Sequence, residues 1–154
     1  MRTKTTIPHM IINIICLVQL IGIVVYLIIA WNNIPEQIPA HFDASGAVTR
    51  YGSRSALLAM PIFAWILFPI ITLSERFPQT WNTGVRVTEE NKFRIYKIIK
   101  NLIVATKLIL VTTFTYLTVV QSLSRNLHIW FMPMFIIVFF GTFAYFIIKL
   151  IRAR

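Results

Sequence analysis

Four long apolar stretches dominate the chain, and each is long enough to cross a membrane as a helix. They run over residues 10–31, 55–73, 102–123 and 129–148. A helix needs about 20 apolar residues to span a hydrocarbon core of ~30 Å. Because 57% of the 154 residues are hydrophobic and only 13% are charged, a soluble domain could not cover this much apolar surface. The sequence therefore predicts an all-α membrane protein, one domain over residues 1–154 that forms a four-helix transmembrane bundle.

Lysine and arginine are unequally divided between the segments that connect these stretches. Eleven of them lie in the terminal segments and in residues 74–101, whereas three lie in residues 32–54 and 124–128. Short segments rich in Lys and Arg remain in the cytoplasm, so we expect both termini inside and residues 32–54 outside. The net charge of +10 is then a topology signal that also favours contact with the lipid bilayer, and nucleic-acid binding is not expected.

Lys107 is the one cation within a predicted span, five residues from its start. We expect its flexible side chain to extend to the lipid headgroups, with a buried functional cation as the alternative. No acidic residue falls within the predicted spans, which argues against proton-coupled transport. The same span carries hydroxyl residues along one helical face, which predict a packing seam or, alternatively, a polar lining: Thr112, Thr115, Thr118 and Ser122.

The outer segment 32–54 has the composition of an ordered loop. Pro35 and Pro39 favour an extended backbone, because proline fixes its own φ and restricts the residue before it. A turn is expected from Asp43 to Gly46, and a second bend at Gly52. The fold expected is therefore a helical bundle with an ordered extracytoplasmic loop between its first two helices.

Two histidines and one carboxylate fall in the outer segments. His41 and Asp43 alternate in an extended stretch, so their side chains point to the same side, and His128 lies in the second outer loop. They are weak candidates for metal ligands, since a closed structural site needs four ligands. The alternative is that His41 and Asp43 hydrogen-bond the loop backbone and Arg50 or Arg54. We expect no metal site and no cofactor.

The loop also resembles a known family. The pattern Ile-Pro-x-His-Phe-Asp-x-x-Gly over residues 38–46, followed by Tyr-Gly-Ser-Arg over residues 51–54, resembles a bacterial membrane family, domain of unknown function 1648. The same domain forms the N-terminal part of SdpI-type immunity proteins. The resemblance implies the plasma membrane of a bacterium and, through those relatives, protection against a secreted peptide toxin and signalling across the membrane.

These observations favour a binding, sensing or immunity-like protein over an enzyme, because no nucleophile lies beside His41 and Asp43. The outer loop would recognise a peptide, an envelope component or a partner protein, and residues 86–100 could dock a cytoplasmic partner. The alternative is a small transporter, or a transporter subunit, that works as a homo-oligomer. The residues expected to build the recognition surface are Pro35, Pro39, His41, Phe42, Asp43, Gly46, Tyr51, Gly52 and Arg54.

Overall fold

The computed structural model describes residues 5–153 as four long helices with a two-stranded hairpin between the first two. Short 3₁₀ turns, η1 to η3, join these elements. In chain order the elements are α1 (Ile7–Ala30), η1 (Trp31–Asn33), β1 (Gln37–Phe42), β2 (Val48–Ser53), η2 (Arg54–Leu58), α2 (Ala59–Ser74), η3 (Pro78–Thr80), α3 (Lys92–Ser122) and α4 (Phe131–Ile151).

The four predicted spans are confirmed as helices that are long and apolar enough to cross a membrane. The candidate spans are Ile7–Asn33, Arg54–Ser74, Lys92–Ser122 and Phe131–Ile151. Helix α3 includes the ten residues before the third predicted span and runs unbroken for 31 residues, about 46 Å. Its basic first turns are amphipathic: Ile95 and Ile99 are buried while Arg94 and Lys97 are exposed. The chain therefore has the architecture of a multi-pass membrane protein.

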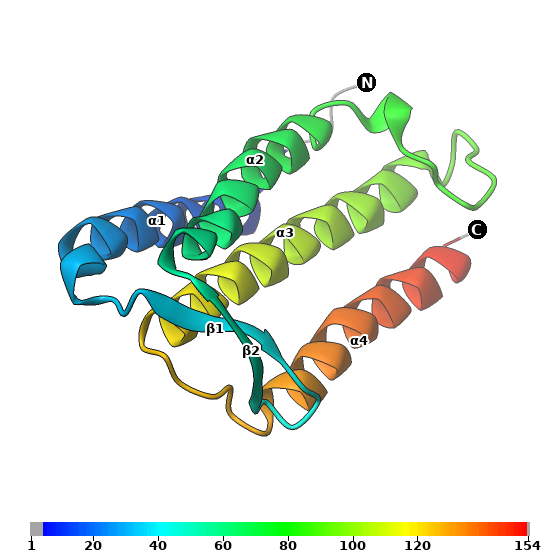
Figure 1. The fold of residues 1–154 in the computed structure, drawn as a ribbon. Helices are drawn as coiled ribbons and strands as arrows, with labels where there is room; N and C mark the ends of the chain where they lie inside the picture. The colour runs from blue at the N-terminus through cyan, green and yellow to red at the C-terminus, as the bar shows by residue number, and fades with distance from the viewer. Residues whose placement is uncertain (1–4, 154) are drawn as a thin grey trace.

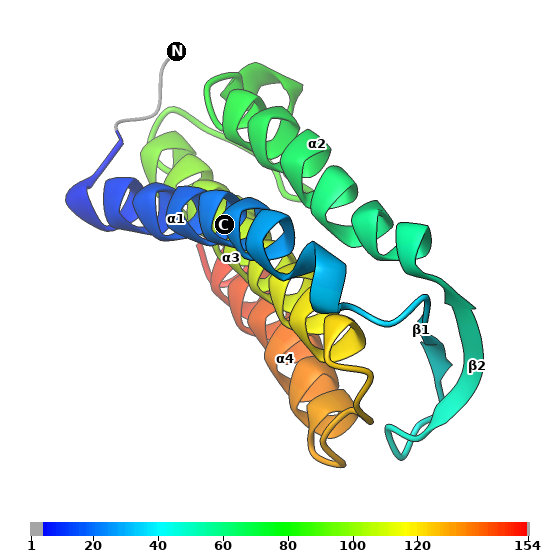
Figure 2. The same cartoon turned by 60° about the vertical axis from the view of Figure 1, so that its left-hand side comes forward.

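Helix α3 forms the centre of the bundle, with α1 and α2 on one side and α4 on the other (Figures 1 and 2). It packs against all three other helices, whereas α4 packs mainly against α3. We call the end of the bundle formed by residues 31–58 and 123–130 the hairpin end. The other end, formed by residues 5–9, 75–95 and 149–153, is the terminal end, because His9 of α1 contacts Asn101 and Ala153 packs with Ile95 there.

Three apolar clusters follow one another along the bundle. At the hairpin end, Ile38 of β1 and Leu57 of η2 pack against α1. In the middle, Cys16 and Leu20 of α1 contact Ala64 of α2 and Val111 of α3. At the terminal end, Ile95 and Ile99 pack with Ala153. These clusters bury aliphatic side chains between the helices, and they include the single cysteine of the chain as a small packing residue.

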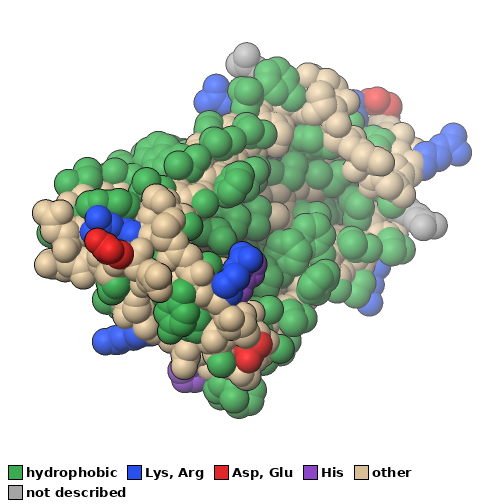
Figure 3. Space-filling model, in the orientation of Figure 1, with side chains coloured by type: hydrophobic (Ala, Val, Ile, Leu, Met, Phe, Trp, Pro, Cys, Tyr) green, Lys and Arg blue, Asp and Glu red, His purple; other side chains and the backbone are tan. Residues whose placement is uncertain are grey.

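Apolar side chains also cover the outside of the helices. No side chain of α4 is buried, and Phe131, Phe135, Phe139 and Phe143 form a ladder of ring contacts along one face, at successive intervals of four residues. Figure 3 shows apolar side chains over the middle of the molecule, with charged side chains over the hairpin and toward the terminal end. Such a surface is stable in hydrocarbon and not in water.

We predict that Leu57→Ala lowers the stability of the bundle by about 2–5 kcal/mol, because it leaves a cavity where Leu57 is fully buried against α1 and β1. The neighbouring Leu58 is 38% exposed, so Leu58→Ala is a matched control that removes the same atoms. Thermal unfolding of the purified protein in detergent measures both variants. Equal losses of stability would show that the hairpin end lacks the packing described.

Candidate functional site

The outer loop folds into a β-hairpin whose two strands differ in burial. Antiparallel pairing brings Ile38 opposite Gly52 and Pro39 opposite Tyr51, with irregularities in register on both sides of His41. In β1, Ile38 and Pro39 are buried against the bundle, whereas Thr49, Arg50 and Tyr51 of β2 are exposed. Strand β1 therefore holds the hairpin on the helices, and β2 is the outer strand.

The turn expected between Asp43 and Gly46 is present. The Asp43 carboxylate accepts hydrogen bonds from the Ser45 backbone at 2.8 Å, from the Ser45 hydroxyl at 2.6 Å and from the Ala47 backbone at 3.0 Å. These bonds, the Ser45 hydroxyl first, lower the pKa of Asp43 below its ordinary value. A lowered pKa means that the turn is stabilised at neutral pH and loses this support only as the pH falls through that pKa.

The tip of the hairpin is attached to the second outer loop, between α3 and α4. The Leu127 backbone N–H donates to the Gly46 carbonyl at 2.9 Å, and the Val48 N–H donates to the Asn126 side chain at 3.2 Å. Gly46 has a φ of +87°, and a Cβ at this position would lie 2.5 Å from the Leu127 carbonyl oxygen. Glycine is therefore required here both by the backbone conformation and by the close approach of the loop.

The base of the hairpin is attached to the end of α1 through Arg54. Its guanidinium donates to the carbonyls of Trp31 and Ile34 at 3.1 and 3.3 Å and lies 4.9 Å from the centre of the Trp31 ring. The Arg54 backbone N–H donates to the Glu36 carbonyl at 2.8 Å. Arg54 was expected on the recognition surface, but its half-buried side chain is occupied within the protein.

The nine predicted recognition residues thus divide by exposure. Pro35, His41, Asp43 and Tyr51 are exposed. Pro39 and Gly46 are buried, and Phe42, Gly52 and Arg54 are half-buried. The buried residues position the hairpin, so a binding surface on this loop would consist of the exposed residues together with Arg50. Whether these residues bind a partner remains a prediction.

The three weak metal candidates are not gathered into one cluster. His41 hydrogen-bonds Arg50, Asp43 bonds the turn, and the His128 ring accepts from the Trp130 backbone at 3.3 Å. Within residues 5–153, no three His, Cys, Asp or Glu side chains come close enough to hold a metal ion. The alternative interpretation, in which His41 and Asp43 stabilise the loop through Arg50 and its backbone, matches these contacts.

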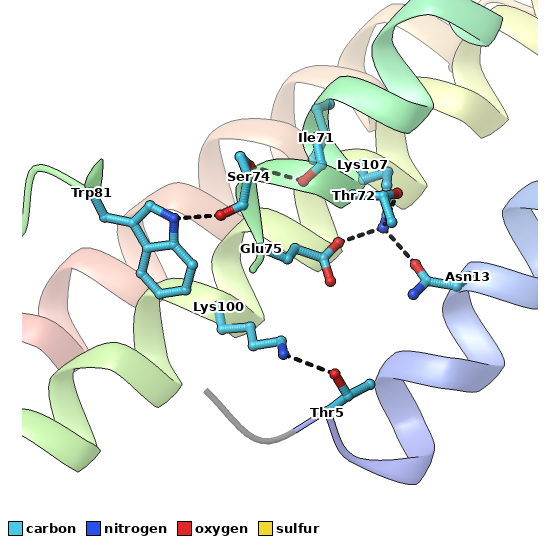
Figure 4. Close-up of polar contacts among 9 residues, drawn as sticks. All are labelled: Thr5, Asn13, Ile71, Thr72, Ser74, Glu75, Trp81, Lys100 and Lys107. Carbon is cyan, nitrogen blue, oxygen red and sulfur yellow. Dashed lines mark hydrogen bonds and ion pairs between the residues drawn. The ribbon is translucent and has the colours of Figure 1, made fainter. Parts of the chain in front are cut away.

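The expectation that Lys107 extends to the headgroups is wrong. Its side chain is fully buried, and its ammonium group forms an ion pair with Glu75, at the C-terminal end of α2. It also donates to the Asn13 side chain of α1 and, at 3.0 Å, to the Thr72 hydroxyl (Figure 4). Glu75 had been assigned to the inner loop and is only 4% exposed. An acidic group is therefore buried directly after the second span, although none falls within the predicted spans.

Further polar contacts surround this ion pair toward the terminal end. The Lys100 ammonium, one heptad before Lys107 on the same face of α3, donates to the Thr5 hydroxyl at 3.2 Å. The His9 ring bonds the Asn101 side chain at 2.7 Å. Polar residues of α1, α2 and α3 thus meet inside the bundle and hydrogen-bond one another there. Two sequence signals could have indicated this: Asn13 within a span, and Glu75 two residues after one.

The hydroxyl residues on α3 differ in burial: some lie inside the bundle and others on its outside. Thr118 is buried and donates to the Phe114 carbonyl four residues earlier at 2.7 Å, and Ser122 bonds the Val119 carbonyl and the Tyr26 hydroxyl. Thr112 is exposed on the outside of the bundle. These contacts match the packing seam between α1 and α3 rather than a continuous polar lining.

Comparison with known proteins identifies part of the chain. Residues 18–65 match the family model of a domain of unknown function, DUF1648. The resemblance expected from the loop motif is confirmed for this segment. The DUF1648 segment begins within α1, contains the whole hairpin and ends within α2, so it includes the attachment through Arg54 but not Asn126 and Leu127, which hold the hairpin tip.

An uncharacterized protein of the archaeon Archaeoglobus fulgidus is 37% identical to this chain over 65 residues. The match covers 37% of this chain and 36% of that protein, so the chain spans about a third of the relative. No solved structure matches the chain. The comparisons therefore support a DUF1648 segment in a multi-pass membrane protein.

We predict that Gly46→Ala detaches the hairpin tip from Leu127, because the new Cβ would meet the Leu127 carbonyl and a positive φ is unfavourable for alanine. Hydrogen–deuterium exchange at the Leu127 amide should become faster by at least about tenfold. Gly84 also has a positive φ, +63°, but has open space around it, so Gly84→Ala separates backbone strain from the clash. Unchanged protection of Leu127 in Gly46→Ala would contradict the contact.

We predict that Lys107→Met destabilises the protein by about 3–5 kcal/mol, because it leaves the Glu75 carboxylate buried without this partner. The double variant Lys107→Met, Glu75→Gln should be less destabilised than the sum of the single variants. Lys92→Met is the matched control, since Lys92 pairs with the exposed Glu89 and such pairs contribute at most about 1 kcal/mol. Thermal unfolding in detergent provides the measurement, and additive effects at positions 75 and 107 would refute the coupling.

Proposed function

We propose that this chain is a multi-pass protein of a bacterial plasma membrane whose hairpin binds an extended peptide on the outer side. The observation that carries the proposal is the difference between the two strands: Ile38 and Pro39 of β1 are buried on the bundle, whereas most residues of β2 are exposed. Attachment of the hairpin at Leu127 and at the end of α1 holds β2 in one position before any ligand arrives. A preorganised surface binds more tightly, because it loses less conformational entropy on binding.

Strand β2 has the features of a peptide-binding edge. The sheet described has two strands, so β2 pairs with β1 along one edge and has no strand on the other. An extended peptide can add to such an edge through main-chain hydrogen bonds. Tyr51 is 57% exposed and offers a large ring that loses little entropy on binding. Arg50 would pair with an acidic side chain or the C-terminal carboxylate of the peptide.

The distribution of charge supports an outward-facing hairpin. Arg76, Arg86, Lys97 and Arg152 all lie toward the terminal end of the helices, away from the hairpin. Because Lys and Arg are retained on the cytoplasmic side, this arrangement favours cytoplasmic termini and a hairpin that faces outward. The DUF1648 resemblance adds SdpI-type immunity proteins as relatives, and a secreted toxic peptide would be the ligand in that case. Residues 86–100 would then be available to a cytoplasmic partner.

A second candidate function is transport. The buried pair of Lys107 and Glu75 favours it, because ionisable groups inside membrane bundles commonly lie on ion or substrate pathways. Four helices packed around aliphatic clusters leave little room for a pathway within one chain. Transport would therefore need a homo-oligomer, with the pathway between copies.

The test of the proposal is protection of cells against a panel of secreted membrane-active peptides. A sensitive bacterial strain that expresses the protein should survive at least one such peptide about tenfold better than the same strain without it. Tyr51→Ala should remove most of this protection, since a central aromatic anchor contributes about 2 kcal/mol or more. Gln37→Ala is the matched control, because Gln37 is exposed on β1 rather than β2.

Binding of the protective peptide to purified protein in lipid nanodiscs then separates recognition from indirect resistance. Wild type and Gln37→Ala should bind alike, and Tyr51→Ala should bind at least about thirtyfold more weakly, which corresponds to the loss of about 2 kcal/mol for such an anchor. Survival that does not depend on the protein, or equal protection by Tyr51→Ala and wild type, would refute the role of β2.

A further inference from the structure

A basic cavity lies at the terminal end, between the start of α3 and the end of α4. Its volume is about 330 Å³, and Arg94, Lys97, Lys149 and Arg152 line it. Each helix contributes two cations three residues apart, and the helices run antiparallel, so both pairs meet at the same end. The remaining walls include Asn101 and Phe146.

These four cations lack acidic partners within the part of the chain that the structure describes. The ion pairs found between residues 5 and 153 join Lys92 to Glu89 and Lys107 to Glu75, and no acidic residue lines the cavity. Four like charges around one cavity repel one another, and an anion between them relieves the repulsion. The cavity is therefore complementary to a group that carries negative charge.

A second cavity adjoins the first, and its walls combine apolar side chains with Thr6 and His9. It measures about 440 Å³ and shares Lys97, Asn101 and Phe146 with the basic cavity. Ile12 of α1 and Val104 of α3 belong to its walls. A ligand with an anionic group at one end and an apolar chain at the other therefore fits the two cavities together.

The depth of the basic cavity matches that of lipid headgroups. Lys149 and Arg152 lie in the last turn of α4 and just after it, where the apolar stretch of that helix ends. Lys97 lies five residues before the predicted start of the apolar stretch in α3. Basic pockets between transmembrane helices at this depth are suited to anionic lipid headgroups.

We propose that the cleft between α3 and α4 is a binding site for one anionic phospholipid from the leaflet at the terminal end. The phosphate of the lipid lies among Arg94, Lys97, Lys149 and Arg152, and one acyl chain follows Ile12, Val104 and Phe146 toward the bilayer centre. The site does not depend on the hairpin, so it stands or falls independently of the peptide-binding proposal.

The test compares lipid binding to full-length protein in detergent by native mass spectrometry. Phosphatidylglycerol and phosphatidylcholine with identical acyl chains are titrated separately. Wild type should bind the first phosphatidylglycerol about tenfold more tightly than phosphatidylcholine. The double variant Lys97→Gln, Arg152→Gln should lose this preference, since it removes two of the four cations that attract the headgroup. Lys97→Arg, which keeps the charge, should retain it.

The control is a double variant at the same end of the bundle that leaves the cleft intact. Arg76 and Arg86 are exposed and lie outside both cavities, so Arg76→Gln, Arg86→Gln removes the same charge and should change phosphatidylglycerol binding by less than about twofold. If the two double variants weaken phosphatidylglycerol binding equally, the lipid is attracted by basic surface charge in general, and the proposed site is wrong. The site is also overturned if wild type shows no lipid preference or if soluble glycerol phosphate displaces the lipid at equal concentration.

Discussion

The structure depends on one constraint: hydrocarbon, and not water, surrounds the helices. Because lipid offers no hydrogen bonds, the backbone crosses it as four helices, and apolar side chains can face outward as well as inward. The polar groups that remain must find partners within the bundle. Lys107 does so with Glu75, Asn13 and Thr72, and these contacts join α1, α2 and α3 at a depth where aliphatic packing alone provides little specificity.

Local sequence patterns were sufficient to predict the helices and the turn of the hairpin. A membrane span depends on the length of one continuous apolar stretch. The turn depends on Asp43, Gly46 and the residues between them. The wrong predictions concern contacts between distant residues. Lys107 lies 32 positions from Glu75, and no local pattern around either residue indicates that the two side chains pair. Nothing near Gly46 in the sequence indicates Leu127 either, so its close contact with the second outer loop could be found only in the structure.

The two ends of the bundle differ in their chemistry, and α3 connects them. At the hairpin end, a DUF1648 segment presents an exposed strand that is attached at its tip and base. At the terminal end, the first turns of α3 carry cations that face the end of α4 across a cleft. The proposed peptide site on β2 is connected to the end of α3 only through the loop at Leu127, and the proposed lipid site includes Arg94 and Lys97 near the start of that helix. The buried ion pair lies between them.

Locating the hairpin on one side of the membrane tests the proposed outward-facing topology most directly. In a Cys16→Ala background, single cysteines are introduced by Ala44→Cys in the hairpin turn and by Glu90→Cys before α3, both at exposed positions. A membrane-impermeant maleimide is then applied to intact and permeabilised cells. The account predicts that position 44 is labelled in intact cells and position 90 only after permeabilisation. Labelling of both positions in intact cells, or the reverse pattern, would contradict it.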